Sequence, residues 1–455
     1  MVEARDLRES GFFLYQHFDL WSSRVIAELL LGKKGGLMAR FVAKRLQFRN
    51  GERHSVLSKP GGLPIHEATL FLAGFRTRGK AANTIHSVCA TLALLYRWAY
   101  SSEIDLLQRL RQGRFLTLPE LNRLADTAQY RVANLSSKDA DESCKAKVVN
   151  IKRIRMRRKA AERETIAVDV STQASRLRYI ADYLSYLATY IGTTLPQHQR
   201  IELELESARA LKAFRAHIPP VSRRAKLGAR QGLSQEDQDR LLDIIRPDSP
   251  NNPWKRGFVR QRNWLIVVLL LATGMRRGEL LGLQIGDLNP QLPRLRIVRR
   301  ADTNKDPRRD QPNTKTNDRE IELRPAIMRA VWVYINKYRR KVKAARKYPQ
   351  LIVSVGGQPL SAKSVDKIFA QIRQACPDLP VQMTSHVMRH TWNERFSEQA
   401  ELLQLSDAVE EKARNEQQGW ADNSKAALTY TRRHASRKGR ELSLKLQEKL
   451  DVPDQ

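Results

Sequence analysis

The sequence is poor in cysteine and contains no long apolar run. Its three cysteines, Cys89, Cys144 and Cys376, are scattered and form no Cys-x-x-Cys pair, which argues against a disulfide framework and a zinc site. The longest apolar stretch, Trp264 to Ala272, is too short to span a bilayer. The N-terminus lacks the basic, apolar and small-residue order of a signal peptide. We therefore expect a soluble protein of the reducing cytoplasm, with no membrane partner and no metal.

Acidic residues are scarce relative to basic ones. Lys and Arg number 81 against 48 Asp and Glu, which gives a formal net charge of +33 at pH 7. Such an excess predicts a nucleic-acid partner that is bound with strong salt dependence. Ribosomal and chromatin proteins can be as basic, but they are usually short or of low complexity. This chain has 455 residues and 41% hydrophobic content, enough for two or three cores.

The N-terminal half divides into an uncertain start and a helical region. Residues 1–62 form either an accessory element or a flexible arm. In residues 63–218 the apolar side chains recur at helical spacing, with a cap offered by Asn83-Thr84. The repeating positions are Ile85, Val88, Leu92, Leu95 and Trp98 in one helix and Leu177, Ile180, Leu184 and Leu187 in another. A basic insertion near residues 136–165 is either a solvated loop or a contact to the DNA backbone.

The C-terminal half predicts a second domain. Residues 219–232, with Pro219-Pro220 and a basic stretch, indicate a linker, and a boundary near residue 225 is expected. Ser234 caps a helix, and a buried helix ends at the Gly274 turn. Paired strands are expected at 295–298 and 319–323. Residues 233–434 are thus expected to form an α-rich α+β domain, with a C-terminal tail at 435–455 that could dock on another subunit.

Three short motifs carry the chemistry of this second domain. They are Thr273 to Leu280, which holds Arg276 in a Gly turn that opens a helix; His386 to Arg389; and Leu428 to Thr431. Two arginines, a histidine and a late tyrosine together could hold a phosphodiester and attack it. Their order and spacing resemble those of the tyrosine recombinase (phage integrase) family, across residues 233–434. The preceding helical region resembles the core-binding domain of that family more loosely.

The resemblance implies a mainly α fold with a small β-sheet, in which a helical core-binding domain and the catalytic domain form a clamp on DNA. It implies that Arg276 and Arg389 hold the phosphate oxygens. Glu279 supports the site and orients its neighbours. The alternative for Arg276 is a surface ion pair with Glu279 or Asp287, and such a pair is more expected for Arg277.

The remaining catalytic positions follow from the same resemblance. Lys315 would protonate the departing 5′ oxygen and His386 would transfer a proton or donate a hydrogen bond. Trp420 replaces the more common histidine, so it either donates from its indole N–H to a phosphate oxygen or simply packs. Tyr430 would be the nucleophile, and core packing is its alternative.

The expected reaction is site-specific recombination of double-stranded DNA through a 3′-phosphotyrosine, by a tetramer, without a cofactor, and with accessory DNA-bending or recombinase proteins as further partners. A type IB topoisomerase and a noncatalytic DNA-binding protein on the same fold are the alternatives. Further DNA contacts are expected from basic residues in loops and in the linker. They are Arg76, Arg78, Lys80, Lys152, Arg153, Arg155, Arg157, Arg158, Arg223, Arg224, Lys305, Arg308 and Arg309.

Overall fold

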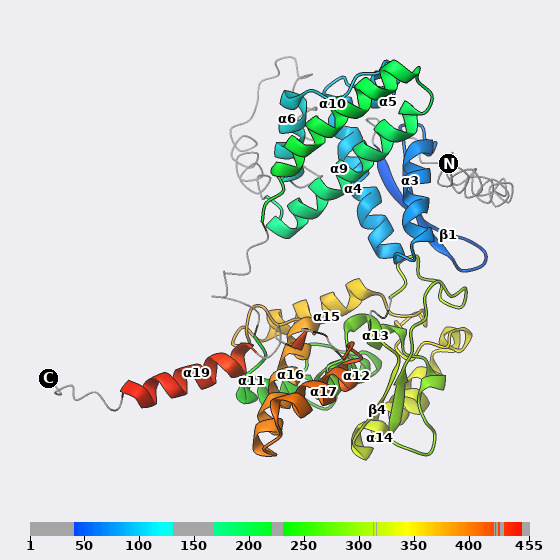
Figure 1. Cartoon of the computed structure of the whole chain (residues 1–455). Coiled ribbons are helices and arrows are strands. Elements are labelled where there is room, and N and C mark those ends of the chain that lie inside the picture. The colour runs from blue at the N-terminus through cyan, green and yellow to red at the C-terminus, as the bar shows by residue number, and fades with distance from the viewer. Residues whose placement is uncertain are drawn as a thin grey trace, which may run out of the picture. The chain divides into compact units, whose positions relative to one another are not determined.

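The computed structural model describes residues 41–130, 167–220, 231–312, 314, 316–422, 424, 426–427 and 432–447, with the backbone alone at 432–434. The chain divides into two compact units (Figure 1), the first built mainly from residues up to Arg224 and the second mainly from Ala225 onward. This division falls inside the segment interpreted as a linker. Across the described ranges, no helix has the length and apolar character needed to cross a bilayer.

The first unit is helical apart from one hairpin. Its elements are β1 (Val42–Gln47), β2 (Arg53–Ser58), α3 (His66–Thr77), α4 (Ala82–Ser101), α5 (Leu106–Arg111), α6 (Leu118–Ala128), α9 (Val170–Gly192) and α10 (Gln197–Ala216). The core lies around α4 and α9, which contact each other and most of the other elements. Every apolar position that the helical spacing singled out on α4 and α9 is buried, so both predicted helical faces are confirmed.

Part of residues 1–62, which the sequence left as either an accessory element or a flexible arm, forms a hairpin. Strands β1 and β2 pair antiparallel from Val42↔Ser58 to Gln47↔Arg53, and Leu57 is part of the core around α4. The Arg97 side chain of α4 donates hydrogen bonds from Nε and Nη2 to the Phe41 carbonyl, at 2.9 and 2.6 Å. Both strands, β1 (Val42–Gln47) and β2 (Arg53–Ser58), therefore belong to the first unit together with the helices.

The expected cap of α4 is also wrong. The helix begins at Ala82 with Ala81 as its N-cap, and no side chain makes a cap hydrogen bond. The side chain of Asn83 instead accepts a hydrogen bond from Arg45 Nη1 of β1, at 2.6 Å. The Asn83 side chain is therefore used in a tertiary contact with the hairpin and not in capping the helix.

The second unit is mostly helical with a two-stranded sheet, as the sequence predicts. Its elements are α11 (Gln235–Ile245), α12 (Gly257–Thr273), α13 (Arg277–Gly282), η2 (Ile285–Asp287), β3 (Arg294–Ile297), β4 (Arg319–Glu322), α14 (Pro325–Val333), η3 (Tyr334–Tyr338), η4 (Arg339–Lys341), η5 (Lys343–Lys347), α15 (Ala362–Ala375), α16 (Ser385–Leu402), α17 (Asp407–Gln418) and α19 (Arg432–Gln447). The strands pair antiparallel from Arg294↔Glu322 to Ile297↔Arg319. The fold class, mainly α with small antiparallel sheets, is thus confirmed.

Helix α12 is the centre of the second core. Its apolar side chains are buried on all sides, and the helix packs along α16, as expected for a helix without a polar face. Ser234 caps the preceding helix, since its Oγ accepts from the Asp237 N–H at 3.1 Å. Because α12 ends where the first arginine motif begins, its burial fixes that motif against α16.

Candidate functional site

A left-handed glycine ends α12 and directs the chain into the first arginine motif. Gly274 has φ +61°, and a Cβ added there would lie 2.7 Å from Cδ2 of Trp392 and 2.8 Å from Nε2 of Gln418. Only glycine avoids both the backbone strain and this crowding. The turn places Arg276 immediately before α13, so the position of its side chain follows from the end of a buried helix.

Arg276 and Glu279 interact across the first turn of α13. The Arg276 N–H donates to Oε2 of Glu279 at 3.0 Å, and its Nη1 lies 3.4 Å from Oε1. The Arg276 side chain is 31% exposed whereas that of Glu279 is fully buried. The ion pair foreseen as the alternative for Arg276 is present. It is long, however, and it leaves the guanidinium open to solvent, where an anion can reach it.

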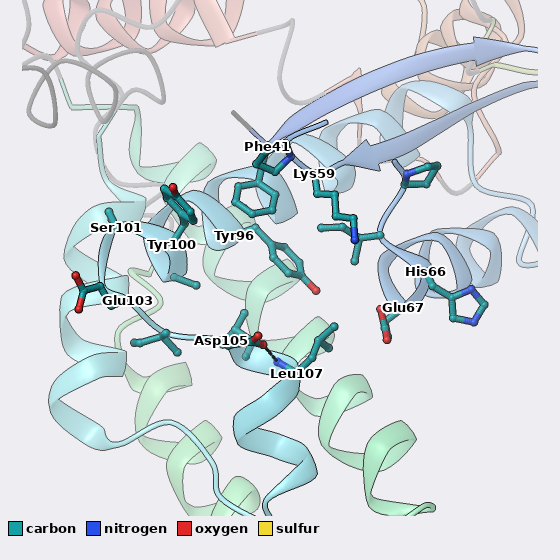
Figure 2. Close-up of a pocket in the computed structure, with 16 residues that line it drawn as sticks. Phe41, Lys59, His66, Glu67, Tyr96, Tyr100, Ser101, Glu103, Asp105 and Leu107 are labelled. Carbon is teal, nitrogen blue, oxygen red and sulfur yellow. Dashed lines mark hydrogen bonds between the residues drawn. The ribbon is translucent and has the colours of Figure 1, made fainter. Parts of the chain in front are cut away.

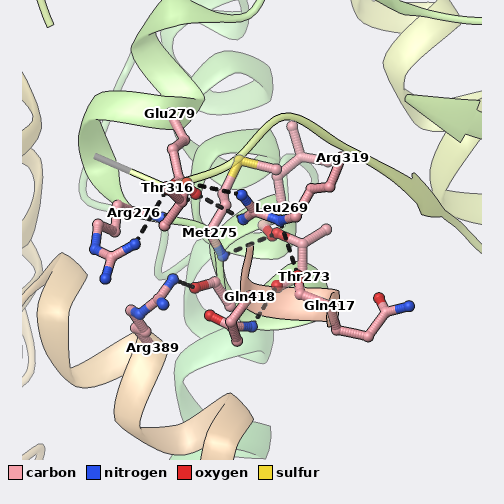
Figure 3. Close-up of polar contacts among 11 residues, drawn as sticks. Leu269, Thr273, Met275, Arg276, Glu279, Thr316, Arg319, Arg389, Gln417 and Gln418 are labelled. Carbon is pink, nitrogen blue, oxygen red and sulfur yellow. Dashed lines mark hydrogen bonds and ion pairs between the residues drawn. The ribbon is translucent and has the colours of Figure 1, made fainter. Parts of the chain in front are cut away.

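Arg319 is a central residue of the site that the sequence did not single out. Its Nη2 donates to Oε2 of Glu279 at 2.8 Å, its Nη1 to Oγ1 of Thr316 at 3.0 Å, and its Nε to the Gln417 carbonyl at 2.8 Å (Figure 3). Thr316 in turn donates to Oε1 of Glu279 at 2.9 Å. Arg319 therefore ties α13, the loop before β4 and the end of α17 together.

Glu279 is ionised although it is buried. Burial raises the pKa of its carboxyl, but the charge and hydrogen bond of Arg319, the charge of Arg389 and the Arg276 N–H together outweigh burial and hold the pKa below the ordinary value of 4.5. A buried Glu needs such a partner. That requirement is the signal by which Arg319, in the motif next to the lysine loop, could have been found.

Arg389 joins the second motif to the first. From α16 its Nη1 donates to the Gly274 carbonyl at 2.7 Å, so it is bonded to the turn that carries Arg276 (Figure 3). The residue is 1% exposed, and its guanidinium carbon lies 5.2 Å from the ring centroid of Trp420. The two predicted arginines thus converge, with one open to solvent and the other covered.

Trp420 and His386, the two other predicted residues near Arg389, differ in exposure. Trp420 is 7% exposed and packs against the guanidinium, an arrangement that favours the packing alternative with an added cation–π attraction. It follows Gly419, which has φ +63° and accepts from the Asn317 N–H at 2.9 Å. His386, in the first turn of α16, is exposed, and its ring meets that of His390 edge-on at 4.8 Å.

Several predicted residues lie outside the described ranges. They are Lys315 and Tyr430 of the catalytic set, and Lys152, Arg153, Arg155, Arg157, Arg158, Arg223 and Arg224 among the DNA contacts. The residues on both sides of Lys315, Thr314 and Thr316, are buried at 5% and 7% exposure. The loop that carries Lys315 is therefore packed into the second unit at both flanking positions.

The other predicted DNA contacts differ in how far they reach solvent. Arg78 and Lys80, after α3, are exposed and Arg76 is partly exposed, with the Arg78 guanidinium 4.8 Å from the Phe75 ring. In the second unit, Lys305 and Arg309 are exposed. Arg277 pairs with Asp366, as expected for a surface arginine.

Arg308 differs from the other predicted DNA contacts in that its side chain is nearly buried. Its side chain is 9% exposed, pairs with Asp306, and donates to the carbonyls of Leu360 and Leu281 at 2.7 and 3.0 Å. All of these partners are within the protein. Arg308 therefore braces the loop between β3 and β4 through partners inside the protein, a role that composition does not reveal.

An open pocket of about 900 Å³ lies in the first unit, away from the predicted residues (Figure 2). Glu67, Glu103 and Asp105 line it together with Lys59, between aromatic side chains such as Tyr96. Asp105 caps α5 by accepting from the Leu107 N–H at 3.1 Å. Because acids outnumber basic groups on its walls, the pocket does not suit a phosphate. Where the structure describes side chains, no group of three or more His, Cys, Asp or Glu could hold a metal ion.

Comparison with known proteins agrees with this geometry. The model of the phage integrase family matches residues 231–436. These residues form a phage integrase domain. The domain begins at the linker and contains Arg276, Glu279 and Arg389, and also Lys315 and Tyr430.

Individual relatives of the phage integrase domain are distant. Tyrosine recombinase XerD of Halalkalibacterium halodurans is 25% identical over 142 residues, which cover 31% of this chain and 42% of XerD, so the match spans less than half of that relative. The Tn1549 transposon integrase in complex with a circular intermediate DNA is 17% identical, with a TM-score of 0.37 over 62% of this chain and 97% of that one. The XerH site-specific recombinase bound to a difH substrate is 14% identical, with a TM-score of 0.40 over 78% of this chain and 96% of that one.

Proposed function

We propose that this chain is a site-specific DNA recombinase, an integrase or transposon recombinase, that cleaves and rejoins DNA through a 3′-phosphotyrosine on Tyr430. The observation that carries the proposal is the bond of 2.7 Å from Arg389 to the Gly274 carbonyl. It brings the second arginine motif onto the turn of the first, more than a hundred residues away, inside a phage integrase domain. Two converging guanidiniums suit the nonbridging oxygens of one phosphate.

In the proposed reaction, the phenolic oxygen of Tyr430 forms a bond to phosphorus while the bond from phosphorus to the 5′ oxygen breaks. His386 accepts the phenolic proton and Lys315 supplies one to the departing oxygen. Arg276 and Arg389 stabilise the charge that builds on the nonbridging oxygens. A 5′ hydroxyl then attacks the phosphotyrosine and restores a phosphodiester, so no ATP is needed.

The buried state of Arg389 adds a step to this mechanism. Arg389 is 1% exposed and its guanidinium packs against the Trp420 ring, so a phosphate does not reach it in this arrangement. We therefore propose that DNA binding moves Trp420 off the guanidinium, exchanging a cation–π contact for a charged hydrogen bond to the phosphate. Glu279 and Arg319 would hold Arg276 and the Lys315 loop in place during this change.

The proposed assembly is a homotetramer on two duplex sites in the cytoplasm, with accessory DNA-bending or recombinase proteins as further partners. Strand exchange between two duplexes needs four cleaving subunits, one for each strand. The exposed arginine and lysine side chains after α3 and in the loop between β3 and β4 would contact the backbone of the bound DNA.

The test is a suicide substrate, nicked next to the cleavage point, after a footprint of the bound DNA has defined the site. The wild type is expected to form a DNA adduct that resists SDS, and the Tyr430→Phe variant is expected to form none. Tyr190→Phe, at a residue 38% exposed in the first unit, is the matched control and should keep adduct formation. Absence of an adduct with the wild type, or its presence with Tyr430→Phe, contradicts the proposal.

Two further measurements on the same protein identify the alternative functions. Relaxation of a supercoiled plasmid without exchange between two sites indicates a topoisomerase. Specific binding without any covalent adduct indicates a noncatalytic DNA-binding protein. Each outcome replaces the proposed recombinase with a named activity.

A further inference from the structure

A long stretch of the second unit has no acidic residue. Between Glu322 and Asp366 there is no Asp or Glu, whereas ten Lys and Arg occur. Nine of the ten are exposed and one, Arg339, is buried. Six of the exposed ones fall within residues 337–347 and are here named the basic platform: Lys337, Arg340, Lys341, Lys343, Arg346 and Lys347. Within the described part of the chain, none of the six takes part in an ion pair.

The buried arginine locks the backbone that carries the platform. Arg339 is 5% exposed, and its Nη2 donates to the carbonyls of Ala345, Tyr348 and Gln350 at 3.1, 2.7 and 2.8 Å. A buried guanidinium with three backbone acceptors holds the turns η4 and η5 against each other. The platform is therefore a fixed surface, and little backbone entropy is lost when it binds a partner.

A close packing contact supports the same turns from the other side. Gly357 has φ +82°, and a Cβ there would lie 2.6 Å from the Ala345 backbone nitrogen. Ala345 itself is fully buried. The cations of η5 thus stand on a backbone that is clamped by Arg339 and packed against Gly357, unlike a solvated loop of similar charge.

The platform lies apart from the catalytic arginines. The chain just after the platform is joined to the segment after α13. The Ile285 N–H donates to the Pro349 carbonyl at 2.9 Å, and Gln284 and Gln350 form a β-bridge. These contacts are to the chain that follows the C-terminal end of α13, whereas Arg276 precedes its N-terminal end. The platform and the site therefore approach opposite ends of one short helix.

We infer that the basic platform binds the sugar–phosphate backbone of double-stranded DNA, at phosphates other than the one that is cut. A cluster of exposed, unpaired cations on a braced backbone suits a polyanion. A second copy of this chain, with its net charge of +33, would be repelled. The inference relies on the proposed function only in that the same DNA molecule is bound.

The salt dependence of binding tests this inference directly, because a side chain that no longer neutralises its phosphate lowers the slope of log K against log salt by about 0.9. The platform variant combines Lys341→Gln, Lys343→Gln, Arg346→Gln and Lys347→Gln. The control variant removes the same charge at exposed positions elsewhere, with Arg209→Gln, Lys212→Gln, Arg240→Gln and Lys412→Gln. Binding of each to a random-sequence duplex is measured over a series of salt concentrations, after thermal melting shows that all are folded.

Relative to the wild type, the slope of log K against log salt is expected to fall by about 3 to 4 in the platform variant and by about 1 or less in the control variant. An unchanged slope, or an equal loss in both variants, overturns the inference. If the platform variant with four substitutions does not fold, the double variant Lys343→Gln, Lys347→Gln replaces it, and its slope is expected to fall by about 2. The double variant Arg209→Gln, Lys212→Gln is then the control.

Adduct formation by Tyr430 is a separate measurement in these variants. A lowered slope without any adduct in the wild type supports the platform and contradicts the recombinase. An adduct in the wild type together with an unchanged slope in the platform variant supports the recombinase and contradicts the platform. The two proposals can therefore fail independently.

Discussion

At the scale of single residues, the site depends on an ionised carboxylate that has no contact with water. Glu279 is held by Arg319, whose side chain is 5% exposed, and by the hydroxyl of Thr316. Buried ion pairs contribute little net stability compared with apolar packing, but removal of one partner leaves the other charge uncompensated. Glu279 and Arg319 are thus important mainly because they fix the positions of three segments.

Glu279→Gln is expected to lower the free energy of unfolding at pH 7 by about 3 kcal/mol, because Arg319 is left buried without a counter-charge. The folded pKa of Glu279 lies below its ordinary value of 4.5. Its stabilising effect is therefore complete above that value and is lost as the pH falls through the lower, folded pKa. Urea denaturation at pH 7 and in acid should show the gap between wild type and variant shrinking. If the difference in unfolding free energy between wild type and variant does not change with pH, Glu279 is not the ionised partner of Arg319.

Arg276→Lys tests the need for a planar fork at the phosphate. The positive charge remains, so DNA affinity should change little, whereas a lysine cannot hold two oxygens at once. The rate of adduct formation on the suicide substrate is expected to fall at least about a hundredfold. Arg277→Lys, at the surface pair with Asp366, is the control and should keep the wild-type rate. Equal rates for both variants would remove Arg276 from the catalytic set.

At the scale of secondary-structure elements, two left-handed glycines position the site. Gly274 ends α12 two residues before Arg276, and Gly419 ends α17 directly before Trp420. Helices α12 and α16 pack together, which brings Arg389 to the Gly274 carbonyl. The helices thus act as rigid supports, and their ends determine where the functional side chains point.

Gly274→Ala is expected to destabilise the protein by about 1 to 3 kcal/mol, because its backbone is left-handed and the added methyl group would crowd Trp392. Adduct formation should fall as well, since the turn orients Arg276. Gly282→Ala, where a Cβ meets open space, should leave the free energy of unfolding, measured by urea denaturation, within about 0.5 kcal/mol of the wild type. If Gly274→Ala changes neither the free energy of unfolding nor adduct formation, the left-handed turn does not position Arg276.

At the scale of the whole molecule, the described residues form two large, separate cores. One gathers around α4 and α9 and the other around α12 and α16. Each is large enough to fold as a domain. Stability is therefore expected to be a property of each unit and not of the chain as a whole.

Calorimetry should accordingly show two unfolding transitions, or one broad transition whose van't Hoff enthalpy is smaller than the calorimetric enthalpy. Glu279→Gln should shift only the transition of the second unit. A Leu177→Ala substitution in the core of the first unit, where Leu177 is fully buried, should lower the transition temperature of that unit alone, with a loss of about 2 to 5 kcal/mol in its free energy of unfolding. One sharp transition that moves as a whole in both variants would refute the independence of the two units.

Local patterns predicted the elements well where the signal is periodic or a cap is strong. The buried faces of α4 and α9, the Ser234 cap and the pairing of β3 with β4 all follow from residue order. The hairpin at 42–58 was missed because its strands, with the sequences VAKRLQ and RHSVLS, alternate only weakly between apolar and polar residues. Their place is decided by burial of Leu57 against α4, which is a long-range contact.

The sequence by itself determined the chemistry available to this protein: a strongly basic chain, two arginine motifs, and a glycine turn that only one residue type tolerates. Tertiary structure alone decided which basic residues are used for what. Arg276 is partly open to solvent, Arg389 is buried against the Trp420 ring, Arg319 is buried on Glu279, and Arg308 braces a loop. The reason is physical, because a guanidinium has the same charge everywhere and its role depends on which acceptors the fold brings within reach.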